Sequence, residues 1–165
     1  MKKPNQLFIF LGILLFSCIG TALAQQTHYV TLHVNTAEIT SQNESSVCYF
    51  TAQSPDAEQI RTDEDLENFT IHVNAGDLII WNGVSSNSPD TDYVNITSIN
   101  YQGGENVFDQ NVLNGNGETP EIVVGMVNDG TNGYTEKYVI YFTVYVNGEK
   151  RGGKFHIDPK IAVKP

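Results

Sequence analysis

The chain has 165 residues, with 19 Asp and Glu against 9 Lys and Arg, and its formal net charge is −10. That length fits one domain, and the acidic excess has the wrong sign for binding DNA or RNA through phosphates, which needs clustered cations. Two cysteines exclude a disulfide-rich scaffold and a four-thiolate zinc site.

The first 24 residues predict a secretory signal peptide. Lys2 and Lys3 precede an apolar run over residues 7–19, which at 13 residues is shorter than the roughly 20 that a membrane-spanning helix needs. An Ala-Leu-Ala sequence ends at Ala24 and predicts cleavage there. We therefore expect an exported bacterial protein, periplasmic or extracellular, with no transmembrane segment in its mature chain. A retained anchor helix and a lipoprotein attached through Cys18 are the less favoured alternatives.

Residues 25–165 predict a single all-β domain. No stretch of helical length has apolar residues at 3.6-residue spacing, whereas short alternating runs recur between Gly, Asn, Asp and Pro. About eight strands at this spacing indicate an antiparallel β-sandwich of the jelly-roll, immunoglobulin-like or cupredoxin-like kind. The one helical candidate covers residues 62–68. The predicted strands cover residues 29–34, 47–51, 69–73, 78–81, 93–101, 121–127, 137–147 and 153–157.

Two tight turns set the expected pairing of these strands. The turn at residues 74–77 is expected to join strands 69–73 and 78–81 as partners, and Asn147-Gly148 is expected to close a second hairpin. The run over residues 138–146 is apolar or aromatic on both faces. It indicates either a central strand covered on both sides or a strand with one core face and one aromatic patch.

Charge is unevenly distributed along the chain. Residues 25–136 hold 17 acids and one cation, a net −16, whereas residues 137–165 hold six cations and two acids, a net +4. The favoured interpretation is that the basic C-terminal strands partly neutralise nearby acidic loops. The alternative is head-to-tail self-association between a basic surface and an acidic one.

One segment is similar to the strand pattern of a blue-copper protein. Residues 76–82 match the frame GD-x-(V/I)-x-W-x-N, but no histidine follows in residues 83–93, and Cys48 lies too early to supply the thiolate ligand. The resemblance therefore supports the sandwich and argues against copper. A surface metal site from histidines on neighbouring strands is a minor alternative. The histidines predicted on the polar phase of their strands are His33, His72 and His156.

Catalytic signatures are absent from the sequence. There is no G-x-S-x-G, no H-E-x-x-H and no phosphate-binding glycine loop. Cys48 lies in the β-type run VCYFT, which favours a buried, inert thiol over a reactive one. We therefore predict that the protein is not an enzyme and that it uses no cofactor.

Two segments resemble the bacterial inclusion-body protein family, whose named members are PixA and AidA. The first is residues 75–84, AGDLIIWNGV, and the second runs from Tyr141 to Ile161 and includes the closing sequence GKFHIDPKI. The resemblance implies a jelly-roll-like β-sandwich and brings no catalytic residues with it. The named members are cytoplasmic, whereas this chain has a predicted export signal, so a shared fold is expected without a shared role.

These observations predict an exported, non-catalytic module that binds an unknown ligand or associates with itself. A carbohydrate-binding, lectin-like module and a metal-binding, cupredoxin-like periplasmic protein are the alternatives. Because a tryptophan beside polar loop residues can stack on a sugar ring, the candidate ligand site lies at the end of strand 78–81 and in the loop that follows. A core position is the favoured alternative for that tryptophan. The candidate site residues are Trp81, Ser85, Asn87, Asp90 and Asp92.

Overall fold

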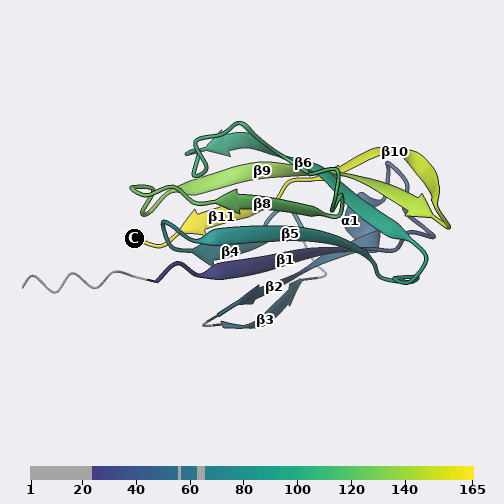
Figure 1. Ribbon diagram of the computed structural model, residues 1–165, viewed down its shortest axis with the longest axis horizontal. Coiled ribbons are helices and arrows are strands. Elements are labelled where there is room, and N and C mark those ends of the chain that lie inside the picture. Colours follow the sequence, from purple (N-terminus) through teal and green to yellow (C-terminus); the bar gives the residue numbers. More distant parts are fainter. Residues whose placement is uncertain (1–23, 56, 63–65) are drawn as a thin grey trace, which may run out of the picture.

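The computed structural model describes residues 24–55, 57–62 and 66–165, with the side chains of residues 57–62 left out. The predicted signal peptide lies outside the described residues apart from Ala24. The all-β prediction is confirmed: the described chain forms strands and a single four-residue helix (Figure 1). The elements are β1 (Thr27–Val34), α1 (Glu44–Val47), β2 (Cys48–Ser54), β3 (Ala57–Thr62), β4 (Thr70–Val73), β5 (Leu78–Ser85), β6 (Tyr93–Gly104), β7 (Val112–Asn114), β8 (Ile122–Met126), β9 (Thr135–Val146), β10 (Glu149–Ile157) and β11 (Lys160–Val163).

The strands form one mixed, nearly closed sheet in the order β3-β2-β1-β5-β6-β9-β11-β4, with β8 beside β5, β7 beside β6, and β10 beside β9. We divide it into a first half-sheet (β3, β2, β1, β5 and β8) and a second half-sheet (β7, β6, β9, β10, β11 and β4). The recorded pairing between β5 and β6 is a single residue pair, Val84 with Tyr93, so the two half-sheets meet there at a corner.

The purely antiparallel sandwich that the sequence predicted differs from this arrangement. β1 runs parallel to β5 over eight residue pairs, and β4 runs parallel to β11 over four. The predicted hairpin between residues 69–73 and 78–81 is also wrong. Gly76, at φ 85°, does make a tight turn there, but β4 pairs with β11 while β5 pairs with β1 and β8. The turn therefore carries the chain from one half-sheet to the other.

Alternation of side chains is the local feature that the sequence predicted well. Val30, Leu32 and Val34 of β1 are buried, and the intervening residues are half-buried or exposed. β5 and β8 repeat the pattern, so that Ile79 and Val123 also face the interior. The buried side chains of both half-sheets form one continuous core.

The burial of β9 distinguishes the two alternatives for residues 138–146, a strand covered on both faces or one with a core face and an aromatic patch. Its even-numbered residues 138–144 are fully buried in the core, whereas Tyr141 and Tyr145 on the other face are half-buried. The strand lies between β6 and the pair β10 and β11. Val139 and Thr143 on this second face are only 7% exposed but lie outside the core cluster, so the face is a largely covered surface with two half-buried tyrosines. The Asn147-Gly148 hairpin into β10 is confirmed, with both residues at positive φ as a type I′ turn requires.

Three short strands escaped sequence prediction. β3 is an edge strand of low apolar content, β7 is an edge strand of only three residues, and β11 follows β10 after only two residues. The predicted helix over residues 62–68 is not observed in its described part, because Thr62 ends β3 and residues 66–68 form a turn. Residues 63–65 of that prediction lie outside the described residues.

Two further features are the position of the chain ends and the length of the helix in the described residues. The described chain begins and ends at the same end of the elongated molecule, where β1 starts and β11 finishes (Figure 1). Among the residues that the structure describes, no helix is long and apolar enough to span a membrane.

Candidate functional site

Trp81 lies in the core, with none of its surface exposed. Its indole Nε1 donates a hydrogen bond to the Tyr138 hydroxyl at 3.2 Å, and its ring meets Phe108 and Tyr138 edge to face. A side chain in this position has no free face for a sugar ring. The placement of Trp81 in a ligand site is therefore corrected, because the alternation of β5 turns this residue inward between the half-sheets.

Three of the other predicted site residues lie together: Ser85, Asn87 and Asp92. They surround Thr36, which the sequence analysis did not identify as a candidate. The buried Thr36 hydroxyl lies 2.5 Å from Asp92 Oδ2, 2.9 Å from Ser85 Oγ and 3.0 Å from Asn87 Oδ1. Asp90 is exposed at the surface of the same loop, outside this cluster. The cluster fastens the loop between β5 and β6 to the residue pair that follows β1.

The polar atoms of this cluster form hydrogen bonds with one another and with the neighbouring backbone. Asp92 accepts hydrogen bonds from Thr36, from the Asn147 backbone N–H at 3.2 Å and from Thr91, and these contacts lower the pKa of its carboxyl against the opposing effect of burial. Ser85 and Asp92 border a shallow hollow of about 220 Å³ beside Tyr93. Because the oxygens of the cluster are already paired, we interpret it as a clamp between two loops.

A second buried cluster joins β1 to the start of β5. His28 Nε2 lies 2.8 Å from Asp77 Oδ2, and His28 Nδ1 lies 2.7 Å from the Ser54 hydroxyl. Both His28 and Asp77 are buried. Because a carboxylate oxygen only accepts, Nε2 carries the hydrogen and donates it to Asp77. The Ser54 hydroxyl is the hydrogen-bond partner of the other ring nitrogen, Nδ1. The cluster therefore contains the residue types of a serine-hydrolase triad.

Two observations distinguish this cluster from a catalytic triad. In a serine hydrolase the serine faces Nε2 and the carboxylate faces Nδ1, and here the two ring nitrogens are exchanged. Asp77 also accepts the backbone N–H groups of Asn74 at 2.7 Å and Gln26 at 3.0 Å. Burial opposes ionisation of Asp77, but these donors together with His28 hold its pKa below the usual value. The cluster is built to tie the start of β1 to the turn before β5.

The remaining titratable candidates lie apart from one another. Cys48 is buried as predicted, and burial, with a smaller contribution from Glu44, raises the pKa of its thiol to about 12. His33 stacks on Tyr49 with ring centroids 4.3 Å apart, and His72 and His156 are exposed on β4 and β10. Within the described ranges no group of three or more His, Cys, Asp or Glu side chains could hold a metal ion.

Glu136 is a buried carboxyl at the start of β9 that the sequence analysis did not single out. It is 1% exposed and its Oε2 accepts the Val107 backbone N–H at 2.7 Å. Burial raises the pKa of Glu136 to about 7, and the single hydrogen bond from Val107 only partly opposes this effect. Its charge state therefore changes close to neutral pH.

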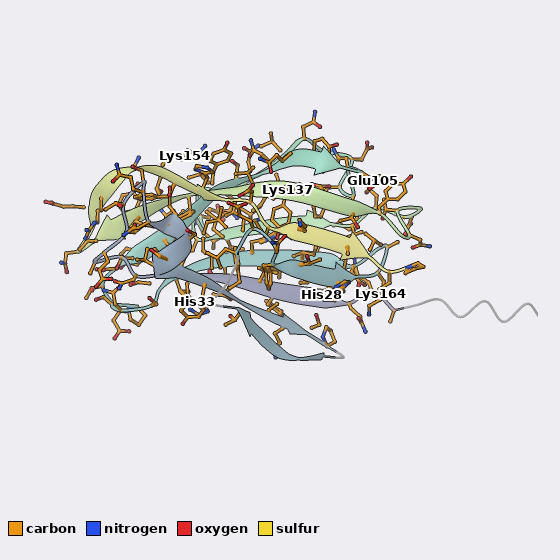
Figure 2. The ribbon with its side chains drawn as sticks, turned by 180° about the vertical axis from the view of Figure 1, so that it is seen from behind. His28, His33, Glu105, Lys137, Lys154 and Lys164 are labelled. Carbon is orange, nitrogen blue, oxygen red and sulfur yellow. The ribbon has the colours of Figure 1, made fainter. Side chains whose placement is uncertain are left out.

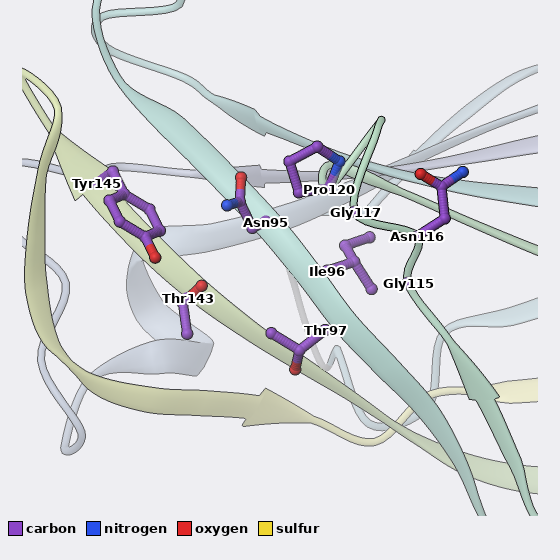
Figure 3. Close-up of a pocket in the computed structure, with 9 residues that line it drawn as sticks. All are labelled: Asn95, Ile96, Thr97, Gly115, Asn116, Gly117, Pro120, Thr143 and Tyr145. Atoms are coloured by element: carbon purple, nitrogen blue, oxygen red, sulfur yellow. The ribbon is translucent and has the colours of Figure 1, made fainter.

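The outer face of the second half-sheet has a groove of about 290 Å³ (Figure 3). One side is the sheet, where Asn95 of β6 lies directly opposite Thr143 of β9. The other side is the loop of residues 115–120 between β7 and β8, which contributes Asn116 and Pro120. Tyr145 closes one end with its half-buried ring. This volume is near the lower limit of known small-molecule sites.

The outer face of β2, β1, β5 and β8 lacks charged residues, and Arg61 of the edge strand β3 lies opposite Thr51 at its border. The register of β2, β1, β5 and β8 brings fourteen outward positions side by side, and none of them is Asp, Glu, Lys or Arg. We call this surface the uncharged face. Its most exposed apolar side chains are Tyr29 at 50%, Val124 at 49% and Met126 at 55%. The fourteen positions are Tyr49, Thr51, Gln53, Thr27, Tyr29, Thr31, His33, Leu78, Ile80, Asn82, Val84, Ile122, Val124 and Met126.

The two outer faces adjoin where Val84 of β5 pairs with Tyr93 of β6, and their far parts lie on opposite sides of the molecule. Figure 2 shows Lys154 at β10 on one side of the ribbon and His33 beside β1 and β2 on the other. His33 belongs to the uncharged face, whereas Lys154 Nζ lies 4.1 Å from the centroid of the Tyr141 ring on the outer side of β9.

These features define a class of protein: an all-β domain on a mixed, nearly closed sheet with two chemically different outer faces. A solved structure with this fold is the inclusion body protein PixA from Burkholderia cenocepacia J2315. The TM-score is 0.60, the sequence identity is 14%, and the match covers 88% of this chain and 99% of that chain. The resemblance to the inclusion-body protein family that the two sequence segments indicated is thus supported at the level of the fold. No family model and no curated protein matches the chain.

Sequence reasoning missed the groove and both buried clusters because their residues come from distant parts of the chain. Thr36 and Asp92 are 56 positions apart, and His28 and Asp77 are 49 apart. One available signal was the polar phase of β6 and β9, where Asn95, Thr97 and Thr143 interrupt apolar runs. Another was the polar His28 placed in the phase of the strand that otherwise carries Val and Leu.

Proposed function

We propose that the protein is an exported, non-catalytic module that associates with further copies of itself through the uncharged face. The single observation that carries the proposal is the composition of that face: fourteen outward positions without a formal charge in a chain whose net charge is −10. Charged side chains cover most solvated surfaces of soluble proteins, so a face without them is a candidate for contact.

A second copy is the occupant that this charge distribution favours. Two chains of the same negative sign repel one another over most of their surfaces, and only a face without charge allows close approach at low cost. Four strands of five to eight residues, spaced about 4.8 Å apart, present roughly 450 Å². Two such faces would together bury about 900 Å², which is the size of a weak, concentration-dependent interface. Isologous packing of one face on the same face of a second copy satisfies this geometry.

The charge-based alternative has less support, because two of the six C-terminal cations already have partners within the chain. Lys137 Nζ lies 2.6 Å from Asp158 Oδ2, and Lys160 Nζ donates to the Asn68 amide oxygen at 2.8 Å. The inclusion-body name of the structurally similar protein is compatible with self-association but concerns that protein. Export rests on the predicted signal peptide, and N-terminal sequencing of the protein recovered outside the cytoplasm tests it: a chain that begins at Gln25 is the expected result.

Sedimentation velocity on the processed protein tests self-association. We expect the mean mass to rise with concentration and to change little between low and high salt, because apolar contacts are not screened. Met126→Glu is expected to leave a monomer, since the new carboxylate would be buried in the interface. Thr97→Ala, on the opposite outer face, is the matched control and should still associate. A wild-type monomer at all concentrations, or association that salt abolishes, would contradict the proposal.

A second candidate function is carbohydrate binding. The observation that favours it is the groove between β6, β9 and the loop of residues 115–120, whose volume and polar lining suit a small hydroxylated ligand. This candidate moves the predicted lectin-like site from Trp81 to the second half-sheet. For the metal-binding alternative, no observation on the described residues offers support.

A further inference from the structure

The groove of Figure 3 holds a buried hydrogen-bonding atom without a partner. Asn95 Oδ1 is shielded from solvent and makes no hydrogen bond to the described residues. A buried acceptor in this state is destabilising, and a hydroxyl group that donates to it would remove that cost. Asn95 stands beside Thr143 in the sheet register and lines the groove with it. The groove thus offers an amide and a hydroxyl at neighbouring positions.

The opposite side of the groove is held in place by the loop's own contacts. Asn116 Oδ1 accepts the backbone N–H groups of Glu118 and Thr119, both at 2.7 Å, which fixes the turn. Gly115 N–H donates to the Thr97 carbonyl at 3.1 Å. A Cβ at Gly115 would lie 2.5 Å from the Ile96 carbonyl oxygen, so only glycine allows the loop to approach β6 so closely. The site is therefore preformed and needs little ordering to bind.

One tyrosine lines the groove, and a second stands beside it in the sheet register. Tyr145 lines it directly, and Tyr93 lies opposite Tyr145 across β6 and β9 with 47% of its surface exposed. Aromatic side chains with one apolar face and one polar end are suited to ligands that alternate C–H and O–H groups. Such a pair next to an amide and a hydroxyl fits the ring of a saccharide.

Cations lie on the β10 side of the same outer face. Lys150 stands opposite Tyr145 in the register of β9 and β10, and Lys154 Nζ lies over the Tyr141 ring. His156 stands opposite Tyr141. Glu149 pairs with Val146 on the other phase of the strand, and Glu118 belongs to the loop on the far side of the groove. A negative group of the ligand is thus favoured beside β10 and disfavoured beside the loop.

We propose that the outer face of β6, β9 and β10 is a binding site for acidic saccharides of the uronic acid type. The sugar ring lies in the groove against Tyr145, with a hydroxyl group on Asn95 Oδ1, and the carboxylate faces Lys150 and Lys154. This proposal rests on the carbohydrate-binding candidate and not on self-association, and the two surfaces adjoin where Val84 of β5 pairs with Tyr93 of β6.

Isothermal titration of the processed protein tests this site, with trigalacturonate as the acidic probe and maltotriose as the neutral one. We expect trigalacturonate to bind at least tenfold more tightly than maltotriose, and its affinity to fall several-fold between 50 and 300 mM salt. Lys150→Gln combined with Lys154→Gln should remove the preference for the acidic probe. Asn95→Ala should weaken binding of trigalacturonate at least tenfold.

Asn100→Ala is the matched control for the groove. Asn100 is another β6 asparagine with a buried, unpartnered side-chain oxygen, but it does not line the groove, so this variant should bind as the wild type does. Circular dichroism confirms that each variant folds. Absence of trigalacturonate binding to the wild type, equal binding of both probes, or equal losses in Asn95→Ala and Asn100→Ala would each overturn the proposal. Retained binding by the monomeric Met126→Glu variant separates it from self-association.

Discussion

The two half-sheets have the same strand alternation but differ in what each holds inside and presents outside. The first buries the ionised Asp77 among four donors and presents the uncharged face. The second buries Glu136 with one donor and presents a groove with tyrosines and lysines. The two carboxyls differ in their donors: Asp77 accepts four hydrogen bonds and its pKa is lowered against the effect of burial, whereas Glu136 accepts one and burial raises its pKa.

Among the changes that distinguish the two half-sheets, Asp77→Ala is expected to have the largest effect on the free energy of unfolding. The change leaves His28 and the backbone N–H groups of Asn74 and Gln26 without their acceptor, at a cost on the order of 3 kcal/mol. The folded-state pKa of Asp77 is lowered, so its contribution is present above the unfolded value of 3.8 and is lost as pH falls through the folded value. Urea unfolding of wild type and variant at pH 7 and pH 3 measures both effects.

The control for that comparison is His28→Ala, which removes one donor and leaves the backbone contacts of Asp77 in place. It should cost less than Asp77→Ala. Equal stability of Asp77→Ala and wild type at pH 7 would show that the cluster does not hold β1 to β5.

The next largest effect on stability is expected at Glu136 in the second half-sheet. Its dependence on pH is opposite to that of Asp77. Burial raises the pKa of Glu136 from 4.5 to about 7, so the folded chain binds more protons between these values. Its stability is therefore highest below pH 4.5 and falls as pH rises to about 7, by roughly 3 kcal/mol. Glu136→Gln should remove this fall while keeping an acceptor for Val107. Urea midpoints at pH 5 and pH 7.5 measure it, and an unchanged slope in the variant would contradict the assignment.

A smaller loss is expected where the β7–β8 loop approaches β6. Gly115→Val would force the loop away from the Ile96 carbonyl, at a cost of about 1–3 kcal/mol, and should weaken trigalacturonate binding because one side of the groove moves. Gly103→Val is the matched control, since a Cβ there meets nothing within 4 Å and Gly103 does not line the groove. Thermal unfolding and titration follow the two effects. Equal behaviour of both variants would mean that the close approach at Gly115 is unimportant for the site.

The smallest effect is expected at the tip of the β9–β10 hairpin, which carries Lys150 next to the groove. Asn147 has φ 49°, a conformation that asparagine adopts more readily than alanine, so Asn147→Ala should cost about 1 kcal/mol. Asn147→Gly should cost less, because glycine adopts this conformation freely. Thermal unfolding compares the two variants. An alanine variant as stable as the glycine variant would show that the turn does not limit the hairpin.

Much of the local structure could be predicted from the sequence, and little of the site could. Alternating residues in β1, the Asn147-Gly148 turn and the buried Cys48 follow from short-range rules, because side chains of a strand alternate and a type I′ turn needs positive φ. The predicted ligand loop identified residues that lie together, but it did not identify their central partner. Ser85, Asn87 and Asp92 do converge, but on Thr36, and they form a structural clamp.

The sequence by itself determined that the chain is acidic, that its described part is a β-protein, and which residues of each strand alternate toward the core. Only the tertiary structure decided which strands are neighbours: β5 lies beside β1 in parallel, and not beside β4 across the Gly76 turn. Alternation is a local property of each strand, whereas neighbours are chosen by the burial that the whole sheet achieves. The burial of Trp81, the raised pKa of Glu136 and the groove at Asn95 all depend on that choice, because each is set by residues from distant parts of the chain.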